Sequence, residues 1–323
     1  MPADWCSALV ELGPRGIALV GTTASGKSAV AMEVARATGA VEIVSVDSMA
    51  VYREMDLATA KPTRADLDAV PHHLIDVLDP SEECTVSLFA GLAEDAIRGI
   101  LSRGRLPLYV GGTGLYHRAV IDQLEIPGQF PDLRLRLEEE AEAVGGLERL
   151  GTELALSDPR AASRIEAGNR RRLLRALEVI RGTGRPFSSF GPGLDHYGEA
   201  SVTQVGILRP LAEVEQRIEE RVQSWIDEGL LDEVASLARR RPALSRTARQ
   251  AIGYRELLEL IEHGGDLDAA LAVTVARTKA LARRQRSWFG RDPRIIWFDD
   301  PAEASAEMIS ALSGSKASAE ARD

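Results

Sequence analysis

Residues 21–28 read Gly21-Thr22-Thr23-Ala24-Ser25-Gly26-Lys27-Ser28, which matches the pattern G-x-x-x-x-G-K-[ST] of phosphate-binding loops. The context is right for such a loop, because an apolar run at 17–20 precedes it and a helical pattern at 29–38 follows it. Glycines let the backbone wrap an anion, N–H groups at the helix N-terminus point at it, and Lys27 adds positive charge. Ser28 offers a hydroxyl to a magnesium ion. The stretch predicts a site for a di- or triphosphate group without saying which.

Apolar runs of strand length recur along the chain, and helical patterns separate the first four. This alternation predicts a parallel sheet with helices on both faces, an α/β fold like that of P-loop NTPases. The six expected strands are residues 17–20, 43–46, 74–77, 106–110, 202–208 and 295–298. Ligands of such sheets bind beyond the carboxyl ends of the strands. The loop at 21–28, Asp47, Asp76 and the turn at 111–114 are therefore expected on one rim.

The middle of the chain has a different character. Between residues 119 and 198 no run predicts a strand, and Gly and Pro residues interrupt the helical patterns. We predict an all-helical insertion domain at 119–198 between two parts of the core, 14–118 and 199–300. Long helices are expected near 211–240 and 266–289. The tail, residues 301–323, is expected to begin as a helix and to end disordered.

Composition narrows the class of protein. A 323-residue chain with 45% hydrophobic and 27% charged residues is typical of a globular protein with a sizeable core. No apolar run is long enough to span a membrane, and no secretion signal opens the chain. Cys6 and Cys84 are the only cysteines, which argues against disulfides and structural zinc and indicates a cytoplasmic protein. The net charge of −10 argues against a protein coated in basic residues, although it allows local basic patches.

Two further segments on the predicted rim are candidates for chemistry. Asp47 closes the second expected strand, where an aspartate serves as magnesium ligand, substrate anchor or general base, or else simply caps a helix. The glycine-rich turn Gly111-Gly112-Thr113-Gly114 directly follows the fourth. Glycines there permit close approach of a ligand, although a plain strand-to-helix connection explains them equally well.

Two helical patterns carry clusters of basic residues. Arg171, Arg172 and Arg175 fall within about 100° on a helical wheel, opposite an apolar face. In the last long helix, Lys279, Arg283 and Arg286 form one basic stripe and Arg277 and Arg284 another. Each group suits either an RNA backbone or a solvated surface with ion pairs.

The sequence shows no arginine-rich lid between the third and fourth expected strands, which a kinase needs to enclose a transferred phosphoryl group. We therefore expect the loop to hold a diphosphate that leaves, rather than a triphosphate that gives up its terminal group.

With these residues in place, the chain resembles the bacterial tRNA dimethylallyltransferase (tRNA isopentenyltransferase) family from about residue 17 to 298. The resemblance rests on ordered blocks. These are residues 21–28 (family GPTASGK[ST]), Ser45-Val46-Asp47-Ser48 with Val51-Tyr52, Thr59-Ala60-Lys61-Pro62, Pro71-His72-His73-Leu74-Ile75-Asp76, Gly111-Gly112-Thr113-Gly114-Leu115-Tyr116, Arg172-Leu173-Leu174-Arg175-Ala176-Leu177-Glu178 and Ile252-Gly253-Tyr254-Arg255.

The resemblance implies transfer of a dimethylallyl group from dimethylallyl diphosphate to N6 of the adenosine 3′ of the tRNA anticodon. It implies that the 21–28 loop, Lys27 and Mg²⁺ at Ser28 hold the diphosphate, that Asp47 is the general base and that Thr113 contacts the target nucleotide. An arginine at 217 or 221 assists the diphosphate, with Arg217 favoured. The implied tRNA contacts are Asp47, Ser48, Met49, Ala50, Thr113, Arg134, Arg171, Arg172, Leu173, Leu174, Arg175, Gln250, Ala251, Ile252, Gly253, Tyr254 and Arg255.

Two positions depart from the family blocks. Thr22 replaces the usual proline of the loop, and Ala58 stands where the family has a glycine. We expect activity to survive both changes.

Three functions remain in competition at this point: a tRNA prenyltransferase acting as a monomer, an ATP-dependent phosphotransferase for a small metabolite, and a non-catalytic RNA-binding nucleotide sensor. A phosphotransferase would not use the arginine-faced helix or the 252–255 block, and a non-catalytic RNA-binding sensor would not need Asp47.

Overall fold

The computed structural model describes residues 15–320 apart from 167, 192, 195, 199 and 200. Two compact units emerge, one formed by Met1–Asp122 with Glu199–Asp323 and the other by Gln123–Gly198. The helical insertion thus begins at residue 123 rather than at 119. The reason is that helix α5 (Gly114–Ile121) continues to Ile121, which is buried in the core of the first unit.

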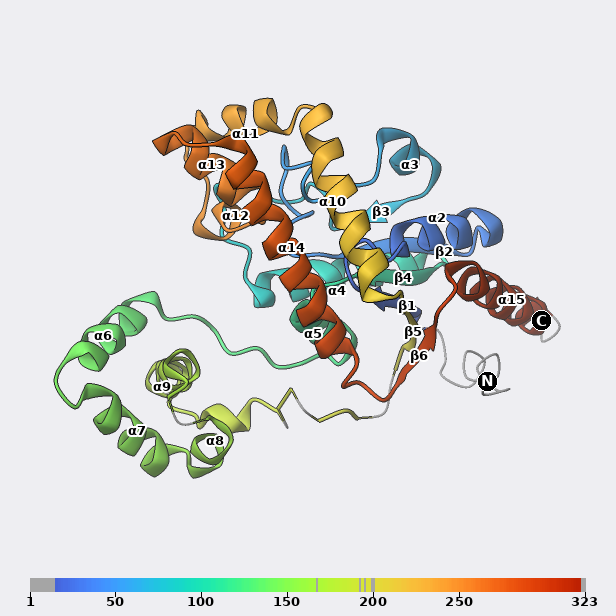
Figure 1. Cartoon of the computed structure of the whole chain (residues 1–323). Coiled ribbons are helices and arrows are strands. Elements are labelled where there is room, and N and C mark those ends of the chain that lie inside the picture. The colour runs from blue at the N-terminus through green and yellow to red at the C-terminus, as the bar shows by residue number, and fades with distance from the viewer. Residues whose placement is uncertain (1–14, 167, 192, 195, 199–200, 321–323) are drawn as a thin grey trace. The chain divides into compact units, whose positions relative to one another are not determined.

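The first unit contains a six-stranded, wholly parallel sheet in the order β3-β2-β4-β1-β5-β6 (Figure 1). The strands are β1 (Ile17–Gly21), β2 (Val41–Val46), β3 (His72–His73), β4 (Leu106–Gly111), β5 (Thr203–Ile207) and β6 (Ile295–Phe298). Since β1 lies between β4 and β5, the phosphate loop leaves the middle of the sheet. The predicted parallel α/β architecture is confirmed.

The prediction of a strand at 74–77 is wrong. The observed strand, β3, is the two residues His72 and His73, and the chain turns immediately after them. Leu74 and Asp76 adopt φ values of 64° and 56°, in the left-handed region that a strand cannot include. Leu74 is buried at 3% exposure because it packs in the core of the first unit, whereas Ile75 and Val77 are half-buried.

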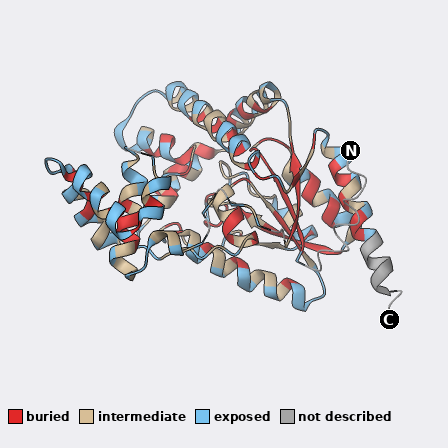
Figure 2. Cartoon of the chain, turned by 90° about the horizontal axis from the view of Figure 1, so that it is seen from below, coloured by how far each residue is buried: buried red, intermediate tan, exposed pale blue. Residues whose placement is uncertain are grey.

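Helices cover both faces of the sheet. On one face α2 (Lys27–Thr38) and α15 (Pro301–Glu320) pack against Ile17 and Leu19 of β1. On the other face lies a larger cluster that includes Ala18 of β1. Its helices are α4 (Val86–Ser102), α5, α10 (Leu211–Asp227), α11 (Leu230–Ala238), α12 (Arg246–Arg249), α13 (Tyr254–His263) and α14 (Leu267–Phe289). The short helix α3 (Arg64–Ala69) follows β2. Figure 2 shows the strands buried between these layers.

The long helix expected at 211–240 is two helices. Gly229, with φ 100°, separates α10 from α11, and a residue with a Cβ rarely adopts that conformation. The helix expected at 266–289 is present as α14, and the helix expected after residue 301 is present as α15. The predicted disordered end of the tail falls partly on 321–323, outside the described residues.

The second unit is helical, as predicted, and has its own core. It consists of α6 (Pro131–Glu142), α7 (Gly146–Ser157), α8 (Pro159–Arg164), α9 (Arg170–Thr183) and a 3-10 turn at Phe187–Ser189. Leu137, Leu150, Leu154, Leu174 and Leu177 pack together in its centre. Arg181 on α9 pairs with Glu140 of α6 and Glu153 of α7, which ties three helices together.

Within the described part of the chain, no helix combines the length and the apolar character that crossing a membrane requires.

Candidate active site

The phosphate loop leaves β1 at Gly21 and enters α2 at Lys27. Gly26 precedes the helix with φ 100° and contributes no side-chain cap, so the first N–H groups of α2 face outward from the helix end. The amide N–H groups of Ala24, Gly26, Lys27 and Ser28 donate to no protein atom among the described residues. The wholly buried Ser25 Oγ also has no partner there. Free N–H groups at the N-terminus of a helix, beside an unpaired buried hydroxyl, are suited to binding an anion.

Two amides of the loop are already hydrogen-bonded within the protein. Thr23 N donates to Gln285 Oε1 at 2.7 Å, and Ser25 N donates to Thr22 O at 3.3 Å. The N–H groups of Ala24, Gly26, Lys27 and Ser28 remain for an anion.

Three cationic side chains surround the loop. Lys27 Nζ donates to Thr22 O at 2.5 Å. Arg217 Nε on α10 donates to Ala24 O at 2.9 Å, and Arg221 lies one turn further along. Arg217 and Arg221 line an open hollow of about 390 Å³ with Glu220 and Ser224.

The electrostatics of these cations suit the binding of an anion. Burial lowers the pKa of Lys27 to about 8, and the charge of Arg221 lowers it further. Burial also lowers the pKa of Arg221, followed in effect by the charge of Arg217. Positively charged side chains that lower the pKa of their neighbours are stabilised by an anion placed between them.

Arg209, which follows β5, also contacts the loop and was not predicted from the sequence. Its Nε donates to Ser25 O at 2.9 Å, and it also pairs with Glu213. Arg209 and Arg217 thus donate to consecutive carbonyl oxygens of the loop. Only its position, two residues past a strand that neighbours β1, could have drawn attention to it.

Asp47 lies at the carboxyl end of β2, as predicted. Its Oδ1 accepts from Met49 N at 2.8 Å and Ala50 N at 3.3 Å, so one carboxylate oxygen forms a turn. The charge of Asp47 raises the pKa of Lys27, which shows that the carboxylate lies within electrostatic reach of the phosphate loop. One carboxylate oxygen of Asp47 is thus used in the turn, while its role in the chemistry stays a prediction.

The glycine-rich turn after β4 lies beside Asp47. Thr113 Oγ1 accepts from Ser48 N at 3.3 Å. A Cβ on Gly112 would lie 2.3 Å from Gln285 Nε2, and one on Gly114 would lie 2.2 Å from the Trp288 ring. These glycines are required because α14 packs directly on the turn.

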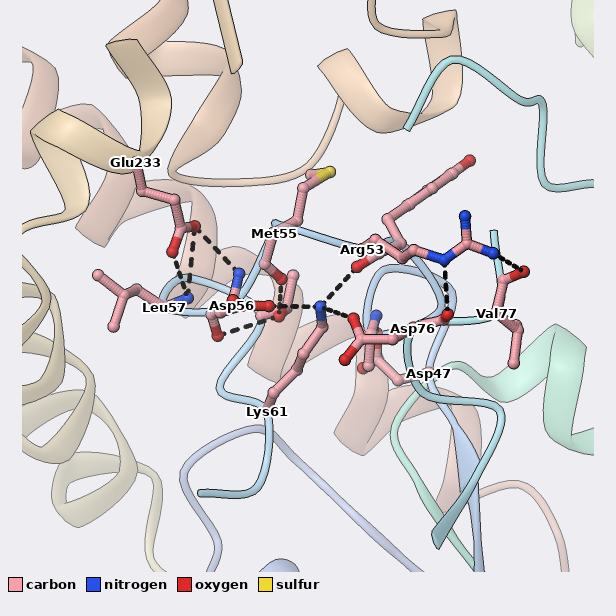
Figure 3. A network of polar contacts seen from close by, with 12 residues as sticks. Asp47, Arg53, Met55, Asp56, Leu57, Lys61, Asp76, Val77 and Glu233 are labelled. Atoms are coloured by element: carbon pink, nitrogen blue, oxygen red, sulfur yellow. Dashed lines mark hydrogen bonds and ion pairs between the residues drawn. The ribbon is translucent and has the colours of Figure 1, made fainter. Parts of the chain in front are cut away.

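Asp76 forms an ion pair with Lys61. Lys61 Nζ donates to Asp76 Oδ1 at 2.5 Å, Asp56 Oδ1 at 2.6 Å and Tyr52 O at 2.5 Å, which uses all three of its protons (Figure 3). This lysine, whose side chain is only 5% exposed, holds the loops after β2 and β3 together. Lys61 of the Thr59–Pro62 block and Asp76 therefore have a structural role in these loops.

The residues present fit a magnesium ion only if phosphate oxygens complete its shell. No group of three or more His, Cys, Asp or Glu residues suitable for a metal occurs among the described residues. Ser28 is exposed at the start of α2, beside the free amides. Mg²⁺ commonly binds through few protein ligands, phosphate oxygens and water, which suits this arrangement.

The expected tRNA contacts of the helical unit differ in their exposure. Arg171 and Arg172 are exposed on α9, Leu173 is half-buried and Leu174 is wholly buried. Arg134 is half-buried and pairs with Glu138. Arg175 pairs with the buried Glu178 and donates to Pro127 O at 2.8 Å, while Glu178 accepts from Phe130 N at 2.9 Å. The Arg175-to-Glu178 block thus fixes the 127–130 segment to α9.

Residues 250–255 lie in the first unit, where they surround the start of α13. Gln250 and Arg255 are exposed, Ile252 is half-buried, and Ala251, Gly253 and Tyr254 are buried. Tyr254 donates to Glu233, which also accepts from Asp56 N at 3.0 Å. A hollow of about 470 Å³ here is lined by Gln250, Arg255, Leu258 and Glu259 together with Arg246 and Arg249, which the sequence analysis missed.

Ala58 is compatible with the fold. A Cβ on Gly253 would lie 2.9 Å from Ala58 Cβ, so Ala58 fills the space that Gly253 leaves. Ala58 has no positive φ, so its backbone does not require the glycine that the family blocks have.

Most of the basic stripe on α14 is engaged within the protein. Lys279 and Arg283 pair with Glu219 and Glu215 of α10, and Arg277 pairs with Glu256 of α13. The sequence left open whether these basic residues contact an RNA backbone or form ion pairs on a solvated surface. For these three residues the structure shows ion pairs.

The fold and the site together define a P-loop α/β protein in which free amides and cations of the loop after β1 lie on the same edge of the sheet as a carboxylate at the end of β2. The sequence model of a family described as IPP transferase matches residues 50–292, and one described as isopentenyl transferase matches 15–77. The chain belongs to the IPP transferase family, as the resemblance predicted.

Relatives named tRNA dimethylallyltransferase cover most of the chain. The one from Bifidobacterium longum is 44% identical over 287 residues, 88% of this chain and 86% of that protein. The one from Streptomyces coelicolor is 45% identical over 284 residues, 88% of this chain and 90% of that protein. The crystal structure of tRNA isopentenylpyrophosphate transferase from Bacillus halodurans aligns with a TM-score of 0.66 at 34% identity, covering 95% of this chain and 99% of that one. A eukaryotic dimethylallyltransferase acting on tRNA, 23% identical, shares the fold with a TM-score of 0.72 over 89% of this chain and 74% of that one.

Proposed function

We propose that this protein transfers the dimethylallyl group of dimethylallyl diphosphate to N6 of the adenosine 3′ of the anticodon in tRNA. The observation that carries the proposal is the placement of Asp47 and Thr113 beside a loop whose free donors and cations fit a diphosphate. Membership of the IPP transferase family and the names of its relatives support it.

The diphosphate is the group for which the loop is built. Free N–H groups of Ala24 and of residues 26–28, with the ammonium of Lys27, stabilise the negative charge that grows as the carbon–oxygen bond breaks. Arg221 and the remaining N–H groups of Arg217 add to this stabilisation. The bonding electrons leave with the diphosphate, so nothing is transferred to the loop. Mg²⁺ held beside Ser28 neutralises part of that charge when it is bound.

The new bond forms between N6 and the allylic carbon that carried the diphosphate. N6 must lose a proton as it bonds, and the free oxygen of Asp47 takes it. Thr113, tied to Ser48 next to Asp47, contacts the target nucleotide. Since an adenine stacked in RNA hides N6, the base has to turn out of the stack to reach this rim.

The tRNA is bound by the exposed members of the predicted set, namely Gln250, Arg255, Arg171 and Arg172. Buried members, such as Leu174 and Tyr254, shape these surfaces from beneath. The enzyme acts as a monomer in the cytoplasm.

One assay tests the function. The protein is incubated with Mg²⁺, labelled dimethylallyl diphosphate and unmodified tRNA, with ATP and small hydroxylated metabolites in a parallel arm. We expect label in the tRNA and release of one diphosphate per group transferred. An unlabelled tRNA together with phosphate transfer from ATP would establish the phosphotransferase alternative instead.

A further inference from the structure

Gln285 of α14 connects two segments of the site that the motifs treat as separate. Its Oε1 accepts from Thr23 N in the phosphate loop at 2.7 Å, and its Nε2 donates to Gly112 O in the glycine-rich turn at 3.0 Å. The side chain is only 9% exposed. Both ends of one amide are thus used, each in its proper role as acceptor or donor.

The contact is close enough to fix the relative position of the two segments. Gly112 approaches so near that a Cβ there would lie 2.3 Å from Gln285 Nε2. One turn along α14, Trp288 packs against Gly114 in the same way. Gln285 and Trp288 therefore flank Thr113 from a single rigid helix.

The connection continues to the base. Thr113 Oγ1 accepts from Ser48 N, and Ser48 is adjacent to Asp47. A continuous path runs from the phosphate loop through Gln285, the 111–114 turn and Ser48 to Asp47. In the proposed function, the donor's diphosphate lies at one end of this path and the nucleotide at the other.

We propose that Gln285 is a positioning residue that couples the diphosphate loop to the turn carrying Thr113. An anion bound in the loop restricts the motion of Thr23. Through its two hydrogen bonds, Gln285 then restricts the motion of Gly112 and Thr113. The inference rests on the proposed function and assigns to Gln285 the alignment of the two substrates. Alignment of reacting groups is sensitive to small displacements, so loss of the link slows transfer more than it weakens binding.

Gln285→Met tests the link, because methionine keeps the length of the side chain and removes both hydrogen bonds. We expect kcat to fall about 100-fold, with KM for tRNA changed less than about 3-fold. Gln223→Met makes the same replacement at an exposed site on α10 and should leave both constants unchanged. Equal kcat for Gln285→Met and the wild type would overturn the proposal.

A binding cycle separates coupling from a merely structural role. Affinity for an anticodon stem–loop RNA is measured with and without saturating inorganic diphosphate. We expect diphosphate to change the affinity of the wild type about 5-fold and to leave that of Gln285→Met unchanged. The same diphosphate effect in both proteins, or its absence in the wild type, would refute the coupling.

Gln285→Glu provides a second variant in case methionine impairs folding, which thermal unfolding would reveal. Its carboxylate still accepts from Thr23 N but cannot donate to Gly112 O, so it too should lose the diphosphate effect on RNA affinity. A wild type that transfers no prenyl group would overturn the proposed function, whereas the binding cycle would still decide the role of Gln285.

Discussion

Arg217 and Arg221 lie one helical turn apart on α10, and the charge of Arg217 adds to burial in lowering the pKa of Arg221. Arg217 already donates to Ala24 O of the phosphate loop. In the part of the chain that the structure describes, no carboxylate forms an ion pair with either arginine. Two adjacent guanidinium groups without a carboxylate partner mark this side of the loop as the place for an external anion.

This arrangement predicts different roles for the two arginines. Arg221→Met should weaken binding of inorganic diphosphate by about 2 kcal/mol, the usual value of a hydrogen bond to a charged group. Arg217→Met should also lower the melting temperature, because it removes the support of Ala24 O. Arg239→Met, an exposed control beyond α11, should do neither. Calorimetric titration and thermal unfolding measure both quantities, and undiminished affinity in Arg221→Met would exclude that residue from the site.

Lys27 gives the site a pH dependence. Its pKa is lowered to about 8 by burial and then by Arg221, so the free protein loses this positive charge as the pH rises through about 8. Diphosphate binds best to the charged form, and its affinity should therefore fall above pH 8 by up to about tenfold per pH unit. Lys27→Met should bind weakly and retain only the pH dependence of diphosphate itself. Parallel curves for the two proteins between pH 7 and 9.5 would contradict the assignment.

Asp47 can be tested without disturbing its turn. Asparagine keeps the oxygen that accepts from Met49 N and Ala50 N and cannot take a proton from N6. Asp47→Asn should lower kcat about 10²- to 10⁴-fold, the range for loss of a general base, while tRNA binding stays within a factor of about 3. Asp76→Asn makes the same change at a carboxylate bound to Lys61 and should preserve turnover. Comparable activities in the two variants would remove Asp47 from the role of base.

The fold was largely predictable because its signals are local. Strand-length apolar runs, the loop at 21–28 and the break in pattern near residue 119 each depend on neighbours in sequence. The failed strand at 74–77 shows the limit. Leu74 is apolar and buried like a strand residue, but Leu74 and Asp76 adopt left-handed backbone conformations that turn the chain. The pattern of apolar residues does not predict the backbone φ angle.

The site was predictable only in part. Motif residues such as Lys27 and Asp47 were found because their spacing from strands is characteristic. Gln285 and Arg209 were missed because their partners, Thr23 and Ser25, lie 262 and 184 residues away in sequence. The basic stripe on α14 could not be interpreted from sequence, since its glutamate partners belong to other helices.

The exposed face of α9 provides the sharpest test of RNA binding by the helical unit. Arg171 and Arg172 are exposed, and no ion pair within the described residues involves them, whereas Arg175 holds Glu178 and Pro127 O. Reversing the charge of Arg175 would confuse lost RNA contact with lost structure, so Arg171→Glu and Arg172→Glu are the informative variants.

Each of these two variants should weaken tRNA binding. Where the lost contact was to a phosphate, the slope of log affinity against log salt should become shallower by about 1. Arg98→Glu on α4 changes the net charge equally at a site exposed on the first unit and serves as the control. If all three variants shift affinity alike, the effect is one of net charge, and α9 is not the surface that receives the RNA backbone. A loss confined to Arg171→Glu and Arg172→Glu, with unchanged thermal unfolding, would place phosphates of the tRNA on that face of the helix.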